Sequence, residues 1–279
     1  MKKSFLTFFF ALITSSIFAL PENERCITFT ENSPFKVTAK GDGILVGACV
    51  ATTATALALP YILDLPDYDE RTYDWNSIND LDRKFARKYN RTIHNAGTVT
   101  VAGCYLITPA LYLAEYSLGN FDFHEGLMVA VMFAETVGIG NSVKNFLKVA
   151  FQRKRPYMYF DGFPEDKLSN HDFEFSFPSG HTLDAFATAS FASYTFCRYF
   201  PESNYRIPVI AGSYALAATT AFLRVASGNH FVTDVLSGAA IGTVIGLSVP
   251  WLHTFATKAS TDKVQLSLSP VSAALTIRL

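Results

Sequence analysis

The sequence predicts an all-α protein, a bundle of six membrane helices. Two observations carry this prediction. Hydrophobic residues make up 49% of the 279 residues and charged residues only 17%, whereas ordinary soluble domains are about 25% charged. Six apolar segments also follow one another along the chain, at 43–63, 96–114, 127–147, 185–197, 207–223 and 235–252.

The first twenty residues precede this bundle and have the three-part layout of a secretory signal. Lys2 and Lys3 come before the apolar run 5–13, and small residues lead to Ala19, after which cleavage would fall. The alternative is an uncleaved membrane anchor. In either case the chain reaches an envelope membrane or a compartment beyond it.

The rest of the chain shows no internal repeat and no linker that would separate a second folded domain. We therefore expect a signal peptide or anchor at 1–20 and a polar segment at 21–42. One helical domain follows at 43–253, and a C-terminal tail at 254–279. The tail from Val264 onward either alternates as a short strand or is loose.

The apolar segments have the properties of membrane helices. Segment 43–63 carries no charged residue and is long enough to cross a bilayer core as a helix. The later segments are rich in Ala, Gly, Ser and Thr, which is typical of helices that pack closely inside a membrane. Prolines near the segments fit helix starts, stops and kinks rather than strands.

Basic residues at 83–91 lie between the first two segments. Leu81, Phe85 and Tyr89 occupy positions i, i+4 and i+8 among them. This spacing predicts a short amphipathic helix lying on anionic lipid, with an ordinary solvated helix as the alternative. The formal net charge of −1 indicates no field that would select nucleic acid, and no protein partner is predicted.

The first of three motifs follows the third apolar segment. Lys148 and Arg155 are seven positions apart, which is two helical turns, and Pro156 would end the helix just past them. Two such cations either anchor the helix at the membrane surface or hold an anion. Arg153 and Lys154 lie off that face and are expected to be anchors.

The second motif, at 177–182, stands immediately before the fourth segment. Ser179 can cap the helix, and the free N–H groups of its first turn, with Gly180 among them, would face an anion. His181 stands at the same helix start, where an imidazole can give a proton to a departing oxygen.

The third motif lies between the fifth and sixth segments. It holds Arg224, His230 and Asp234, and the last two are four positions apart. If the helix begins at Phe231, both side chains lie on one face and the carboxylate can hold an imidazole nitrogen, which leaves a nucleophile of fixed tautomer. With six crossings in turn, all three motifs emerge on the same side. Their cations, hydroxyl, amides and histidines describe a phosphoryl-transfer site.

These motifs resemble those of the type 2 phosphatidic acid phosphatase (PAP2) superfamily, which includes bacterial acid phosphatases and vanadium haloperoxidases. The family pattern is Lys-x6-Arg-Pro, Pro-Ser-Gly-His and Ser-Arg-x5-His-x3-Asp. It matches from Lys148 to Asp234, with Leu223 in place of the usual Ser as the one departure. That departure affects substrate fine-tuning rather than a catalytic group.

The resemblance implies a role for each matched residue. His230 would attack phosphorus to form a phosphohistidine, Asp234 would orient it, and His181 would protonate the leaving group. The phosphate oxygens would be held by Lys148, Arg155, Ser179, Gly180 and Arg224. Because no metal-ligand cluster accompanies the motifs, we predict no metal ion and no other cofactor.

The remaining polar candidates are expected to be structural. His94, His124, His171 and His253 have no partner at ligand spacing and are expected at the surface or an interface. Glu135 lies inside the third apolar segment. We interpret it as a buried, hydrogen-bonded carboxyl. The alternative is that it is a partner of Lys148.

The predicted function is metal-independent hydrolysis of a phosphomonoester or pyrophosphate on a membrane lipid. The lipid classes considered are phosphatidate, lipid A, phosphatidylglycerophosphate and polyprenyl pyrophosphate. One alternative is a periplasmic or secreted soluble acid phosphatase of the same superfamily, and another is a silent anion-binding membrane protein. We expect an enzyme integral to a bacterial-type inner membrane, with its site facing outward.

Overall fold

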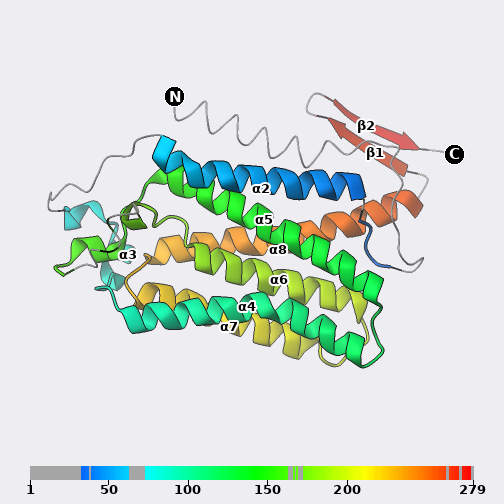
Figure 1. Cartoon of the computed structure of the whole chain (residues 1–279), viewed down its shortest axis with the longest axis horizontal. Helices are drawn as coiled ribbons and strands as arrows, with labels where there is room; N and C mark the ends of the chain where they lie inside the picture. The colour runs from blue at the N-terminus through cyan, green and yellow to red at the C-terminus, as the bar shows by residue number, and fades with distance from the viewer. Residues whose placement is uncertain are drawn as a thin grey trace.

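The computed structural model is a bundle of long, roughly parallel and antiparallel helices (Figure 1). It describes residues 33–37, 39–62, 73–162, 166, 168, 172–261, 264–269 and 272–277. Within these residues the α-helices are α2 (Ala39–Ile62), α3 (Asp80–Phe85), α4 (Arg91–Ser117), α5 (Phe123–Phe151), α6 (Gly180–Tyr199), α7 (Arg206–Ala226) and α8 (Val232–Thr261). The predicted signal at 1–20 lies outside them.

Five of the six predicted apolar segments lie within one long helix each, and the first does so as far as Ile62, so the helical prediction is confirmed. Four helices are long and apolar enough to cross a membrane: α4, α5 with its continuation to Tyr159, α7, and α8 as far as Thr254. Their most apolar windows have mean hydropathies of 1.4 to 1.7. The chain is therefore an integral membrane protein with four apolar helices.

Helix α6 lies at the centre of the bundle and packs against α4, α5, α7 and α8. Its contact with α8 is close because glycines recur every fourth residue along α8. A Cβ on Gly238, Gly242 or Gly246 would lie 2.7, 2.2 or 2.2 Å from a backbone oxygen of α6 or of Ser179 just before it. Only glycine permits this approach, which fixes the start of α6 beside the start of α8.

Helix α2 lies along α5 and is held there by hydroxyl groups. The hydroxyl of Ser142 on α5 contacts those of Thr52 at 2.8 Å and Thr53 at 3.2 Å, and it donates to the carbonyl of Cys49 at 3.2 Å. Small polar residues of this kind join helices where apolar surface alone gives no preference.

One local expectation is wrong. Helix α3 ends at Phe85, and Ala86 has an extended backbone, so no amphipathic helix continues to Tyr89. In the tail, β1 (Val264–Ser269) pairs with β2 (Ser272–Ile277) as an antiparallel hairpin. Of the two options for the tail, the strand is the one observed, and it adds a small β element to the helical fold.

Candidate active site

His230 lies in the link between α7 and α8 and is only 2% exposed. Gly228 makes the turn before it with a φ of +73°, and a Cβ there would lie 2.5 Å from the carbonyl oxygen of Arg87. The Nδ1 atom of His230 is 2.7 Å from the carbonyl oxygen of Ser176. A carbonyl can only accept, so Nδ1 carries the proton and Nε2 keeps its lone pair. That Nε2 faces Arg155 Nη1 at 3.1 Å.

Asp234 does not hold the imidazole directly, contrary to the sequence prediction. Its Oδ2 is 3.8 Å from His230 Nδ1. The reason is that the Ser176 carbonyl accepts the hydrogen bond from Nδ1, and the carboxylate lies beside it. Asp234 Oδ2 instead accepts from the hydroxyl of Ser176 and, at 2.9 Å, from the N–H of Phe231. Ser176 thus connects the carboxylate to the imidazole.

Arg153 extends this connection to α3, so its predicted role as a membrane anchor is wrong. One guanidinium nitrogen donates to Asp234 and the other to Asp82 Oδ2 at 2.7 Å. Asp82 is fully buried and accepts from the N–H of Thr233 at 2.9 Å and from its hydroxyl at 2.6 Å. Burial opposes ionisation of Asp82, but the hydrogen bonds from Thr233 and Arg153 outweigh it and keep its pKa below the usual value. Lys154, the other expected anchor, forms an ion pair with Glu174.

The clamp cations, which are the predicted phosphate-binding residues Lys148, Arg155 and Arg224, do converge beside His230, although not by the predicted geometry. Helix α5 ends at Phe151, because Gln152 is left-handed with a φ of 46°. Arg155 therefore lies beyond the helix that carries Lys148. It is 4% exposed and is held by the Asp172 carboxylate at 2.7 Å and the Asn229 carbonyl at 3.0 Å.

Arg224 reaches the same place from the last turn of α7. It is 2% exposed, and its Nη1 lies 3.3 Å from His94 Nδ1. Its buried Nε makes no hydrogen bond within the part of the chain that is described. A buried guanidinium donor that is not satisfied by the protein is suited to an anionic ligand. His94, expected at a surface or interface, thus contacts a clamp residue.

The Pro-Ser-Gly-His turn stands opposite these cations at the start of α6. The N–H of Ser179 donates to the carbonyl of Asp234 at 3.0 Å, and its hydroxyl contacts that of Thr182 at 2.9 Å rather than capping the helix. A Cβ on Gly180 would lie 3.8 Å from Lys148 Nζ, so the lysine lies directly over the helix start. His181 Nε2 is 3.5 Å from the Thr98 hydroxyl.

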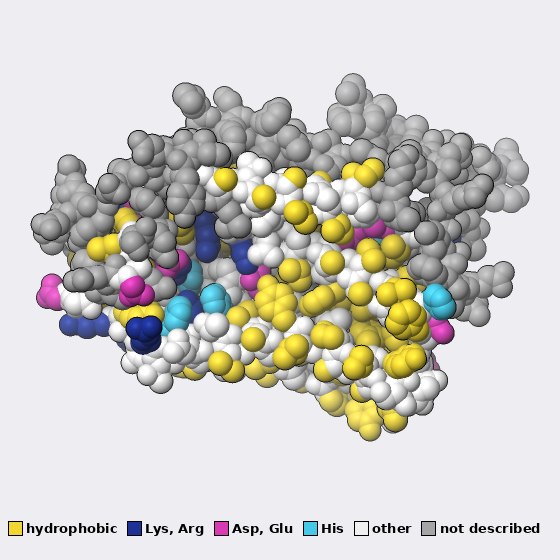
Figure 2. Space-filling model, in the orientation of Figure 1, with side chains coloured by type: hydrophobic (Ala, Val, Ile, Leu, Met, Phe, Trp, Pro, Cys, Tyr) yellow, Lys and Arg dark blue, Asp and Glu magenta, His cyan; other side chains and the backbone are white. Residues whose placement is uncertain are grey.

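The three motifs therefore meet at one end of the bundle, as predicted. Figure 2 shows Lys, Arg and His side chains gathered in a hollow at the end where α3 lies, with hydrophobic side chains over much of the rest of this face. Burial, and then the charges of Arg155, Arg224 and Lys148, lower the pKa of His230 well below its usual value. This lowered pKa favours the neutral imidazole.

His181 is affected by the same charges. Burial and then Arg224 are the largest causes that lower its pKa. A bound phosphate dianion would offset the cations and favour the protonated form of this imidazole.

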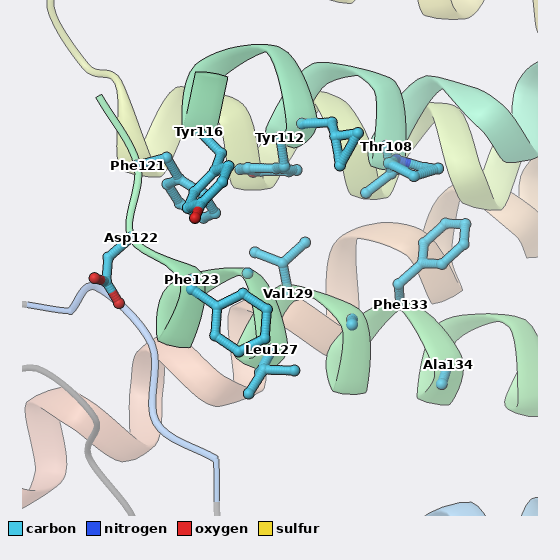
Figure 3. Close-up of a pocket in the computed structure, with 14 residues that line it drawn as sticks. Thr108, Tyr112, Tyr116, Phe121, Asp122, Phe123, Leu127, Val129, Phe133 and Ala134 are labelled. Atoms are coloured by element: carbon cyan, nitrogen blue, oxygen red, sulfur yellow. The ribbon is translucent and has the colours of Figure 1, made fainter. Parts of the chain in front are cut away.

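A cavity of about 710 Å³ opens between α4 and α5, around the turn that joins them. Its lining is mostly apolar, including Tyr112, Phe121, Phe123 and Phe133 (Figure 3). None of the predicted site residues lines it. This cavity is thus separate from the motifs.

Comparison with known proteins agrees with the motifs. Residues 129–258, which carry all three, match the family model described as the PAP2 superfamily. This region is a member of that superfamily. A phosphatidylglycerophosphatase B from Bacillus subtilis (strain 168) is 31% identical over 124 residues, which are 43% of this chain and 54% of that protein.

Other relatives have related names. A lipid A 1-phosphatase from Rhizobium johnstonii is 36% identical over 116 residues, which are 40% of this chain and 43% of that protein. Another from Porphyromonas gingivalis is 37% identical over 79 residues, which are 28% of this chain and 16% of that protein. The chain thus spans about half or less of the length of each curated relative that it matches.

A solved structure is also similar, that of the first transmembrane PAP2 type phosphatidylglycerolphosphate phosphatase from Bacillus subtilis. The match covers 78% of this chain and 92% of the chain in that structure, with 21% sequence identity and a TM-score of 0.38.

Proposed function

We propose that the chain is a membrane phosphatase that hydrolyses a phosphomonoester or pyrophosphate of a membrane lipid through a phosphohistidine at His230. One observation carries the proposal. The buried Nε2 of His230 keeps its lone pair and faces Arg155 at 3.1 Å, beside Lys148 and Arg224. The names of the relatives, phosphatidylglycerophosphatase B and lipid A 1-phosphatase, support the same chemistry.

In the first step, Nε2 of His230 attacks phosphorus and the bond between phosphorus and the lipid oxygen breaks. That oxygen takes the proton of His181, which leaves His181 neutral. Lys148, Arg155, Arg224 and the first-turn amides of α6 stabilise the charge that spreads over the phosphoryl oxygens.

In the second step, water attacks the phosphohistidine. Neutral His181 accepts a proton from that water, the bond between phosphorus and Nε2 breaks, and inorganic phosphate leaves with His230 restored. Throughout, the Ser176 carbonyl holds the proton on Nδ1, and Asp234 positions Ser176. These roles use side chains and backbone groups of this chain alone.

The membrane location favours a lipid substrate over a soluble one. Four helices suited to crossing a bilayer are not what the alternative, a secreted soluble acid phosphatase, requires. The site hollow lies at one end of these helices, where a phosphate headgroup would be presented while its acyl chains stay in the bilayer. The lipid class is to be decided by a panel of phosphatidate, phosphatidylglycerophosphate, lipid A and polyprenyl pyrophosphate.

The test is phosphate release by the purified chain from each lipid of that panel, combined with acid-labile labelling of His230 during turnover. Hydrolysis of at least one lipid, together with a label lost in His230→Ala, is the expected result. Release from none of them would favour the alternative of a silent anion-binding protein.

The proposed orientation places the site on the outer side of the inner membrane. Resemblance to lipid phosphatases favours this side, whereas the basic residues at 83–91 beside the site favour the cytoplasmic side by the positive-inside rule. A single cysteine placed at Asp161, in a cysteine-free variant, separates the two. Labelling of intact cells by an impermeant reagent supports the outward site, and labelling only after lysis overturns it.

A further inference from the structure

A second buried polar cluster lies away from the three motifs and has no place in the proposed reaction. It joins Asp42 of α2, Glu135 of α5 and His253 of α8, whose ligand atoms all lie within 4.8 Å of one another. Asp42 is 7% exposed and Glu135 fully buried, and the side chain of His253 is 11% exposed. Two carboxylates buried together are costly unless positive charge compensates them.

The histidine of this cluster has a fixed tautomer. Its Nδ1 lies 2.6 Å from the carbonyl oxygen of Lys36, so that nitrogen carries a proton. The backbone N–H of Lys36 returns a hydrogen bond to the carbonyl of His253 at 3.4 Å. An Nδ1–H held by a backbone carbonyl is the usual arrangement of a histidine that binds a metal through Nε2.

The Nε2 of His253 faces Glu135 Oε2 at 2.8 Å. Two acceptors at this distance require a proton or a metal cation between them. The other carboxylate oxygen, Glu135 Oε1, is buried and makes no hydrogen bond among the described residues, so without a cation it needs a second proton, shared with the Asp42 carboxylate within 4.8 Å. A cation bound to the carboxylate would satisfy both oxygens, so the contacts of Glu135 favour the metal.

We propose that Asp42, Glu135 and His253 bind one divalent metal ion of the Zn²⁺ or Mn²⁺ class. One imidazole and two carboxylates are ligands that these ions accept, and a charge of +2 balances the two carboxylates. In a tetrahedral zinc site, donor atoms lie roughly 3.3 Å apart. Shifts of about 1 Å in side chains that already lie 2.8 to 4.8 Å apart bring them to this spacing.

The role that follows is structural. The ion would fasten α2 and the segment at Lys36 to α5 and α8, and it would close a loop from residue 42 to residue 253. Figure 1 shows the start of α2 and the last turns of α8 at the end of the bundle opposite α3. Glu135 precedes Lys148 by thirteen positions on the same helix, which is roughly 20 Å. The ion would therefore not touch the substrate.

The test uses the full chain purified in detergent without a polyhistidine tag. Elemental analysis should find about one equivalent of zinc or manganese per chain. EDTA should lower the Tm by roughly 5–10 °C, and Zn²⁺ or Mn²⁺ should restore it. No bound metal, together with a Tm that neither EDTA nor added metal changes, would overturn the proposal and assign the cluster to shared protons.

Variants then locate the ion. Glu135→Gln and His253→Gln should lose the metal and the response of Tm to EDTA. His124→Gln is the matched control, because His124 forms an exposed pair with Asp122 at 3.0 Å, and it should keep both. Metal retained at the same level in Glu135→Gln would overturn this assignment. If either variant fails to fold, the measurements on the unmodified chain still decide whether an ion is bound.

Discussion

A buried histidine lies near each end of α8, and the two differ in the charge that faces them. His230 and His253 both donate from Nδ1 to a backbone carbonyl, at 2.7 and 2.6 Å. Both therefore direct Nε2 into the protein. The Nε2 of His230 meets the cation of Arg155, and the Nε2 of His253 meets the carboxylate of Glu135.

The difference shows how surroundings decide what the same imidazole does. Among cations, the lone pair of His230 stays available, and the uncompensated positive charge attracts a phosphate. Between carboxylates, the Nε2 of His253 is placed to bind the proposed cation together with Asp42 and Glu135. The two ends of α8 are thus expected to bind ligands of opposite charge, and this contrast can be tested by removing parts of each end.

Removal of the nucleophile should have the largest effect. His230→Ala should lower the rate of phosphate release by about 10⁵-fold or more, as expected for the loss of a nucleophile. The acid-labile phosphoenzyme should disappear, while circular dichroism and Tm should show an intact fold. His124→Ala, at an exposed position, is the control. Full activity in His230→Ala would remove the nucleophile assignment.

Asp234→Asn should have a smaller effect, about 10² to 10⁴-fold on the rate. The carbonyl of Ser176 still holds His230 Nδ1 in this variant, whereas the ion pair with Arg153 is lost. Single-turnover kinetics should therefore show slow formation of the phosphoenzyme rather than none. A rate as low as that of His230→Ala would mean that Asp234 acts directly on the reaction.

A still smaller loss, roughly 10-fold, is expected for Asp82→Asn, because Asp82 acts only through Arg153 and Thr233. The matched control is Asp80→Asn on the same short helix, whose side chain is 92% exposed and pairs with Arg83. Comparison of kcat and KM for the two variants is the measurement. Equal rates in both would show that the link from α3 to Asp234 does not position the nucleophile.

The outcome for Asp82 and Arg153 also shows where sequence reasoning ends. Lys148, His181 and His230 belong to three short motifs that together indicate chemistry, and the order of apolar segments brings those motifs to one end. Asp82 lies 71 positions from Arg153 and belongs to no motif. Only the tertiary structure can join them.

The same limit explains why the contact between Glu135 and His253, near the other end of α8, was not predicted. Glu135 was expected to be a buried, hydrogen-bonded carboxyl, and this is confirmed, but its partner His253 was expected at a surface or interface. The two are 118 positions apart, and neither has a neighbouring ligand in the sequence. Similarly, the i,i+4 spacing of His230 and Asp234 predicted a direct hydrogen bond, whereas the two groups lie 3.8 Å apart and the Ser176 carbonyl accepts from Nδ1.

Chelation should have the smallest effect on the rate, because it acts at one end of α8 and the chemistry occurs at the other. Well below the Tm, EDTA should change phosphate release less than about twofold, since the proposed steps use only side chains and backbone groups. Vanadate, an analogue of the phosphoryl group in transfer, should inhibit strongly at the cationic end. Glu135→Gln is the informative control, because it lacks a proposed ligand and should be active with or without EDTA. Loss of activity with EDTA in this variant and its return with Mg²⁺ would place a metal in the reaction itself, and the contrast between the two histidines would then no longer hold.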